Sequence, residues 1–202
     1  MSFLKRLFGS KDNDKSVSKD AEVSPYMTLP NLPLDEQFTF NFKKNGGKFL
    51  YCENVDEIYE HFENILVEND WFEKDVLCFN IDLFPVLEHN KLNFENIKNP
   101  EFVFSTCESL IADEGSILFS SNQFKHYKIN DLPESMIVFA KTSQIKPHKG
   151  EGMSEIKRLY HPKYPTNITT IRNFDIKSKS NSNSLQYSSD PKNLYLLLLE
   201  DL

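Results

Sequence analysis

The sequence has no long hydrophobic run and a deficit of basic charge. The longest unbroken apolar run among its 202 residues covers positions 194–199, which is far too short to span a bilayer. Its 23 lysines and arginines are outnumbered by 30 aspartates and glutamates. General nucleic-acid binding needs a basic surface, so this composition argues against a nucleic-acid partner. Neither a transmembrane segment nor a nucleic-acid-binding function is expected.

Cysteine is also scarce, with only Cys52, Cys78 and Cys107. An odd number without a C-x-x-C pair is neither a disulfide framework nor a set of zinc or iron–sulfur ligands. Each cysteine lies in or beside an apolar run, which is typical of small buried residues on strands. No signal peptide is visible over residues 1–8. The expected location is a reducing cytoplasm, and no cofactor or metal is expected.

The chain is long enough to bury roughly 70% of the surface that its unfolded form exposes. Its 17 phenylalanines are expected to fill that core. Residues 9–24 are rich in Ser, Lys and Asp and contain few large apolar groups. The sequence therefore predicts a flexible tail over 1–31 and one domain over 32–202. Residues 1–8 are amphipathic and are interpreted either as a docked terminal turn or as a weak membrane or partner anchor.

Apolar periodicity predicts a helix over residues 54–68, with Asn54 as N-cap and Glu57 three residues later. Residues 34–45 fit a strand by alternation and a helix by four-residue spacing. Acidic residues at the start and basic residues at the end favour the helix. Further helical segments are expected at 82–89 and 151–160. Strands are expected at 48–52, 76–80, 102–106, 116–120, 136–140, 168–172 and 193–199.

Helices that alternate with apolar strands predict an α/β fold, a three-layer domain with a mainly parallel sheet and helices on both faces. Residues 193–199 are apolar on both faces, which is typical of a central covered strand. Ligands of such sheets bind outside the carboxyl ends of the strands. This rule directs attention to the loop at 106–116.

The segment 106–120 is the most distinctive part of the sequence. A polar turn leaves one strand, a small apolar helical turn is expected next, and Asp113-Glu114-Gly115-Ser116 opens another strand. Gly115 permits a left-handed bend, and Ser116 with nearby backbone N–H groups could hold a carboxylate. Glu114 is the candidate catalytic residue, as a base or nucleophile. The alternative is a strand-connecting turn with solvated acids.

The candidate ligand-binding residues come from the ends of two predicted strands. A guanidinium fork suits a lactate- or pyruvate-like carboxylate, although Arg172 could instead form a structural ion pair with Glu114 or Asp175. Residues 125–163 carry eight basic and four acidic residues, which indicates an anion-attracting rim or a solvated face. The histidine spacing there matches no metal-ligand pattern. The candidate ligand-binding set is Thr106, Glu108, Gly115, Ser116, Arg172 and Asn173.

The segment 110–117, Leu-Ile-Ala-Asp-Glu-Gly-Ser-Ile, resembles a signature of LUD-domain proteins, the lactate-utilisation protein C group. The glycine-then-strand step at 45–48, the proline-led strand at 132–138 and the late strand at 167–172 are similar to further family segments. The resemblance covers roughly residues 35–200. After the late strand, residues 170–176 lack the glycine and serine that the family carries there.

The resemblance implies a fold like that of sugar-phosphate isomerases and CoA transferases. It implies an accessory role in the oxidation of L-lactate to pyruvate, with iron–sulfur oxidoreductase subunits as partners and a small organic anion as ligand. The alternative hypothesis is a non-catalytic binding or interaction protein that keeps the fold but has degenerate ligand loops. A transferase that uses Glu114 as nucleophile rests on fold analogy alone.

Overall fold

The computed structural model describes residues 32–95, 97–175 and 190–201. The predicted tail over 1–31, with its amphipathic start, lies outside these residues.

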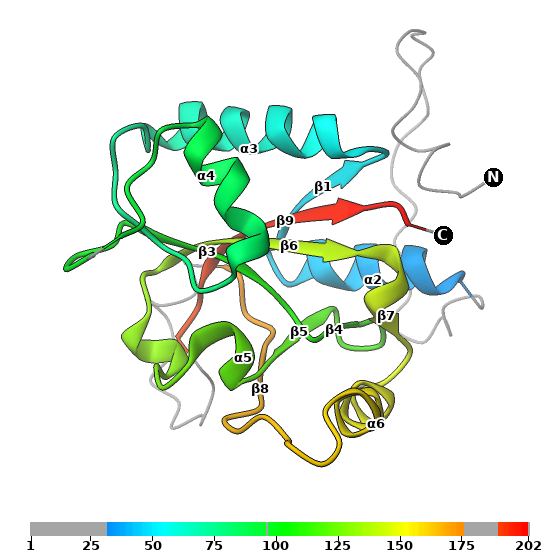
Figure 1. Ribbon diagram of the computed structural model, residues 1–202. Coiled ribbons are helices and arrows are strands. Elements are labelled where there is room, and N and C mark those ends of the chain that lie inside the picture. The colour runs from blue at the N-terminus through cyan, green and yellow to red at the C-terminus, as the bar shows by residue number, and fades with distance from the viewer. Residues whose placement is uncertain (1–31, 96, 176–189, 202) are drawn as a thin grey trace, which may run out of the picture.

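The centre of the fold is a five-stranded parallel sheet in the order β1-β9-β6-β3-β2 (Figure 1). The five strands correspond to five predicted ones, although β2 is shorter than expected. They are β1 (Lys48–Cys52), β2 (Val76–Leu77), β3 (Phe102–Thr106), β6 (Ser135–Lys141) and β9 (Asn193–Leu199).

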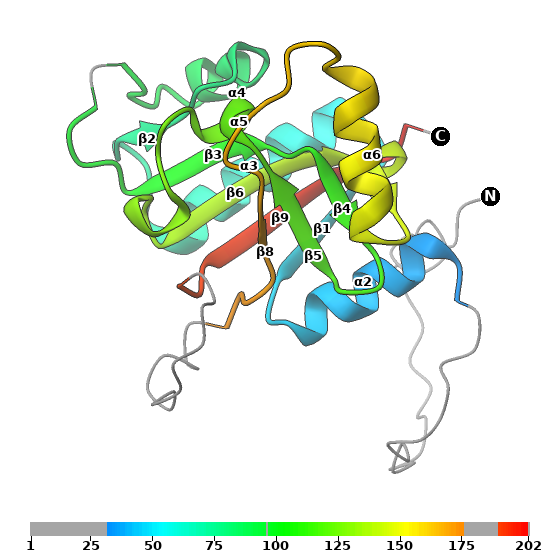
Figure 2. The same ribbon diagram turned by 90° about the horizontal axis from the view of Figure 1, so that it is seen from below.

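A second, four-stranded sheet has the order β7-β4-β5-β8 and mixes parallel and antiparallel pairs. Its strands are β4 (Ser109–Ile111), β5 (Ser116–Phe119), β7 (Ile145–Lys146) and β8 (Thr169–Ile171). Figure 2 shows these strands crossing over the parallel sheet. The helical turn expected between Thr106 and Gly115 is wrong, because β4 is a strand paired with both β5 and β7. Leu110 and Ile111 are fully buried on opposite faces of that strand, as expected of successive residues in a strand covered on both faces.

Helices and sheets stack in layers, and the predicted three-layer α/β architecture is confirmed. Helices α3 and α4 cover one face of the parallel sheet, while α2 and the second sheet cover the other (Figure 1). Helix α6 packs on the outer face of the second sheet through Ile156. The helices are α2 (Leu34–Lys44), α3 (Val55–Asn69), α4 (Phe84–His89), the short α5 (Ser121–Phe124) and α6 (Lys149–Leu159).

Strand β9 explains why one stretch is apolar at every position. Its alternate leucines, such as Leu196, enter the core shared with the second sheet. Tyr195 and Leu197 enter the core beneath α3 and α4. A strand covered on both faces has no solvent-facing side, so the prediction of a central strand is confirmed.

The helices predicted at 34–45, 54–68, 82–89 and 151–160 are confirmed, with ends that shift by a few residues. The Asn54 side chain caps α3 by accepting a hydrogen bond from the Glu57 N–H at 3.0 Å. Segment 34–45 is a helix because Phe38 and Phe42, four residues apart, are both fully buried on its inner face. Short 3₁₀ helices also occur: η1 (Ile81–Leu83), η2 (Ile129–Asp131) and η3 (Thr142–Gln144). Among the described ranges, no helix combines the length and apolarity that a membrane crossing requires.

Candidate functional site

A cavity of about 600 Å³ lies where β3 and β6 end, at the carboxyl edge of the parallel sheet. The segment after β2 forms one wall, and α5 with the end of α6 forms another. This is the edge at which open α/β sheets bind ligands. Most of the residues that line it have polar side chains: Asn80, Asp82, Leu83, Thr106, Cys107, Asn122, Gln123, Phe139, Lys141, Gln144 and Tyr160.

A buried carboxylate, Glu108, lies behind this wall with only 9% of its surface exposed. Its Oε1 atom accepts hydrogen bonds from Ser120 Oγ at 2.5 Å and Asn122 Nδ2 at 3.1 Å. Its Oε2 atom accepts one from the Tyr160 hydroxyl at 3.0 Å. Among the described residues no Lys, Arg or His forms an ion pair with Glu108. Neutral donors from three different segments therefore hold an acidic group beside the cavity.

Tyr160 joins this buried carboxylate to the open space, because it both bonds Glu108 and lines the cavity. Burial raises the pKa of the Tyr160 hydroxyl, and the negative charge of Glu108 raises it further. The phenol therefore keeps its proton at neutral pH and donates a hydrogen bond to Glu108. The lone pairs of the phenol oxygen can accept hydrogen bonds from other groups.

The cation of the cavity is Lys141, the last residue of β6. Just beyond it, Asp201 accepts hydrogen bonds from Thr142 Oγ1 and from the Ser143 N–H, both at 2.9 Å. Burial alone would raise the pKa of Asp201. The hydrogen bonds from Ser143 and Thr142, with the nearby charge of Lys141, lower it below its ordinary value. The last described residue of the chain thus fixes the turn that follows Lys141.

The candidate ligand-binding residues separate into two groups at the two ends of the β4–β5 hairpin. Thr106 lines the cavity, and its Oγ1 atom accepts a hydrogen bond from Asn80 Nδ2 at 3.2 Å. Glu108 precedes β4 at the same open end. Glu114 and Gly115 lie at the closed end, in the turn that joins Ile111 to Ser116.

The closed end packs on α2. Asn41 Nδ2 donates to the Ala112 carbonyl at 2.8 Å, and Asn45 Nδ2 donates to the Glu114 carbonyl at 2.8 Å. Gly115 has φ +59°, and a Cβ there would overlap the backbone of Asn41. Contact between the turn and the helix thus accounts for the glycine of the acid-acid-Gly-Ser motif.

The side chains of Glu114 and Ser116 bond each other, with Ser116 Oγ donating to Glu114 Oε2 at 3.0 Å. Arg172 follows β8, which pairs antiparallel with β5 so that Ile171 lies opposite Ile117. Arg172 therefore lies beside the start of β5, near Ser116, and its side chain is exposed. Asn173 follows it, with its Oδ1 atom accepting from the Asp175 N–H at 3.2 Å.

Because the candidate residues follow the strands predicted at 102–106 and 168–172, the sequence predicts that the two strand ends converge on one edge of a single sheet, and this prediction is wrong. Strand β8 belongs to the second sheet, so the carboxyl-edge rule for parallel strands does not relate it to Thr106. The ligand-binding roles of Arg172 and Asn173 stay predictions, at a place separate from the cavity.

Sequence reasoning missed Asn122 and Tyr160, and it included Lys141 only as one of the eight basic residues of 125–163. Lys141 could have been found by the same rule that selected Thr106, because both end strands of the parallel sheet. Asn122 lies in α5, which is too short to give a periodic signal. Tyr160 reaches the cavity only because α6 packs on the second sheet.

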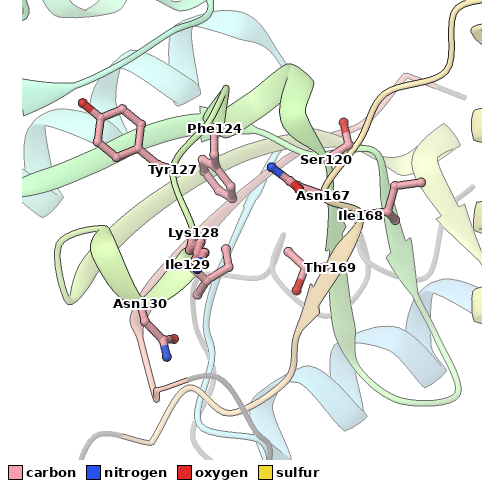
Figure 3. A pocket seen from close by; sticks show the side chains of 9 residues that line it. All are labelled: Ser120, Phe124, Tyr127, Lys128, Ile129, Asn130, Asn167, Ile168 and Thr169. Carbon is pink, nitrogen blue, oxygen red and sulfur yellow. The ribbon is translucent and has the colours of Figure 1, made fainter.

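A smaller cavity, of about 310 Å³, lies on the other side of Ser120. Figure 3 shows its walls, with Phe124, Tyr127 and Ile129 from α5 and the segment after it, and Thr169 from β8. Because Ser120 lines this cavity and also bonds Glu108, the buried carboxylate lies between the two cavities.

Neither cavity has the ligands of a metal centre. In the described part of the chain, no group of three or more His, Cys, Asp or Glu side chains is placed to hold a metal ion. All three cysteines are buried and free. Burial raises the pKa of Cys52 to about 12 and that of Cys78 to about 11, and it also raises the pKa of Cys107. Protonated, buried thiols are poor metal ligands and poor nucleophiles.

Comparison with known proteins gives a match at the level of fold. No protein-family model matches the sequence. No curated protein matches it with significance. The structure is similar to the crystal structure of a DUF162 family protein from Deinococcus radiodurans, with a TM-score of 0.60 and 11% sequence identity. The match covers 83% of this chain and 96% of that chain. At this identity the similarity shows the α/β fold.

Proposed function

We propose that the chain is a LUD-domain-type protein that binds a small organic anion in the carboxyl-edge cavity. Two independent observations support this assignment. The structural neighbour is a DUF162 family protein, a family of the LUD-domain type. The sequence resembles LUD-domain proteins over several segments in the same order. The proposed role is that of an accessory component of lactate utilisation, working beside iron–sulfur oxidoreductase subunits in the cytoplasm.

The observation that carries the proposal is the placement of Lys141 and Thr106 around one cavity at the carboxyl edge. An ammonium group attracts a carboxylate, and a hydroxyl can donate to it. The amide nitrogens of Asn80 and Gln144 already donate to Thr106 Oγ1 and to the Cys107 carbonyl, at 3.2 and 2.8 Å. Lys141 and the Thr106 hydroxyl are therefore the groups best able to select an anion.

Isothermal titration calorimetry with L-lactate and pyruvate tests this proposal. We expect binding that weakens about 10- to 100-fold in Lys141→Gln, since hydrogen bonds to charged groups contribute about 1.5–3 kcal/mol. Lys157→Gln, on the exposed side of α6, is the matched control and should bind like the native chain. Absence of binding of either acid, or equal binding by both variants, contradicts the proposal.

A non-catalytic binding protein with the same fold is the second candidate. It is favoured by the closed end of the hairpin, where Gly115 and the carbonyls of Ala112 and Glu114 are committed to contacts with α2. Under this hypothesis Glu114→Gln changes neither anion binding nor lactate oxidation in the presence of the iron–sulfur subunits. Loss of oxidation with unchanged stability would instead support the catalytic role of Glu114.

A further inference from the structure

Three features distinguish Glu108 from the other acidic side chains in the described ranges. It is the only buried carboxylate there, no cation neutralises it, and each of its oxygens is bonded by neutral donors. Burying an unpaired carboxylate costs free energy, which hydrogen bonds offset only in part. Such groups are frequent at functional sites because they combine a charge with a low-dielectric environment.

The two oxygens of Glu108 are in different situations. Oε1 is occupied by Ser120 at 2.5 Å and by Asn122 at 3.1 Å. In the described part of the chain, Oε2 accepts a hydrogen bond from Tyr160 alone, at 3.0 Å. The hydrogen bond from Tyr160 to Oε2 already points a proton at this oxygen. Oε2 is therefore the atom that can receive a proton, and Tyr160 is the group that can deliver it.

Tyr160 also lines the cavity, which places this residue beside a ligand bound there. At neutral pH the phenol is protonated, and its proton is already directed at Glu108. Lys141 on the same cavity wall can stabilise a negative charge that forms on the ligand.

We propose that Tyr160 and Glu108 form a proton relay that withdraws a proton from a carbon next to the carbonyl of a bound 2-oxo acid. The C–H bond of the ligand breaks and its proton bonds to the Tyr160 oxygen. The proton of Tyr160 moves to Glu108 Oε2, and the electron pair left on the ligand forms an enolate. The reverse transfers restore the 2-oxo acid, so no oxidant or reductant is consumed. This relay rests on the proposed function, because it uses the same cavity and the same class of ligand.

In this relay Tyr160 is the catalytic residue, since it touches the ligand. Glu108 acts through Tyr160. It is a positioning residue, and its Oε2 atom holds the proton that Tyr160 gives up. The alternative is that Glu108 only fastens the start of β4 to α5 and to the end of α6. The two roles make different predictions for the exchange of the ligand's carbon-bound protons with solvent, measured in a protein that remains folded.

The test follows the methyl protons of pyruvate by NMR while the full-length protein is incubated with pyruvate in D₂O. The native chain should accelerate replacement of these protons by deuterium. Tyr160→Phe keeps the ring and removes the hydroxyl, and should reduce the acceleration by about 10²-fold or more. Its dissociation constant for pyruvate should change by less than about threefold, because Lys141 still holds the carboxylate.

Glu108→Gln provides a second variant, because an amide oxygen can still accept from Ser120 and Asn122. It should lose exchange while it keeps pyruvate binding. If Glu108 has only a structural role, the free energy of unfolding and the affinity for pyruvate should fall together in Glu108→Gln. Tyr164→Phe and Glu151→Gln are the matched controls, since Tyr164 is 52% exposed and Glu151 lies on the surface of α6.

Each outcome has a separate meaning. Pyruvate binding without accelerated exchange overturns the relay and leaves the anion site intact. Exchange that persists in Tyr160→Phe also overturns the relay. Failure of both pyruvate and lactate to bind overturns the proposed function, and the relay with it.

Discussion

Gly115, in the β4–β5 turn, packs directly against the backbone of Asn41 in α2. The two residues are far apart in the sequence, yet a Cβ on Gly115 would overlap the Asn41 main chain. The side chain of Asn41 holds the same turn through the Ala112 carbonyl. This contact fastens the distinctive motif of the sequence to the first described helix.

Gly115→Ala should lower the free energy of unfolding by about 2–4 kcal/mol, because the residue needs positive φ and has no space for a methyl group. Urea unfolding followed by the fluorescence of Trp71 measures this change. Gly150→Ala is the matched control, since no atom lies within 4 Å of a Cβ there and the residue is helical. The control should be neutral or stabilising by up to about 1 kcal/mol. Equal effects of the two substitutions would contradict the packing argument.

Asn41→Ala should destabilise the protein by about 1–2 kcal/mol, because the part-buried Ala112 carbonyl loses its donor. Asn99→Ala, at an exposed position, should change the free energy of unfolding by less than about 0.5 kcal/mol. Chemical denaturation of both variants beside the native chain makes the comparison. A null effect at Asn41 would show that water replaces the amide without cost.

The cysteines should resist alkylation at pH 8. Burial raises the pKa of each thiol above its ordinary value of 9.0, so the reactive thiolate is nearly absent in the folded state. Mass spectrometry after iodoacetamide treatment should show little modification of the native protein and three modified residues after denaturation. Rapid labelling of folded Cys52 or Cys107 would contradict the assignment.

The same thiols predict a loss of stability at alkaline pH. A group whose pKa is higher in the folded state contributes stability that is complete below its unfolded pKa. For Cys52 this contribution should disappear as the pH rises from about 9 towards about 12. Cys52→Ala should make the slope of unfolding free energy against pH shallower in this range.

Asp201 predicts the opposite dependence, at acidic pH. Its pKa is lowered in the folded state, so its contribution is complete above the unfolded value and is lost as the pH falls through the folded value. Asp201→Asn should be less stable than the native chain at pH 7. The difference should shrink as the pH is lowered below the ordinary carboxyl range, which thermal unfolding across pH can measure. A constant difference at every pH would show that charge is not involved.

The sequence by itself determined the elements whose signal is local. The helix at 55–69 follows from its apolar period and from Asn54, and the central strand at 193–199 follows from its apolar residues on both faces. Such elements can be predicted from the sequence because their patterns depend only on residues within one or two helical turns or along a single strand. The parallel α/β class followed from the alternation of such elements.

The sequence predicted the strands at 116–120 and 168–172, but tertiary structure alone decided that they join β4 and β7 in a second sheet, and it alone decided the membership of the candidate site. Strands β4 and β7 are too short to show a period. Strand β4 pairs with β5 in a hairpin and with β7 from a distant part of the chain, and these pairings complete its hydrogen bonds. Consequently Glu108 and Glu114, six positions apart, lie at opposite ends of one hairpin. Tyr160, 52 positions from Glu108, bonds its carboxylate. The sequence analysis placed Glu108 and Glu114 in one candidate site because they are close in the sequence. The fold separates them, because the turn of the hairpin packs on α2 while its open end lies at the cavity.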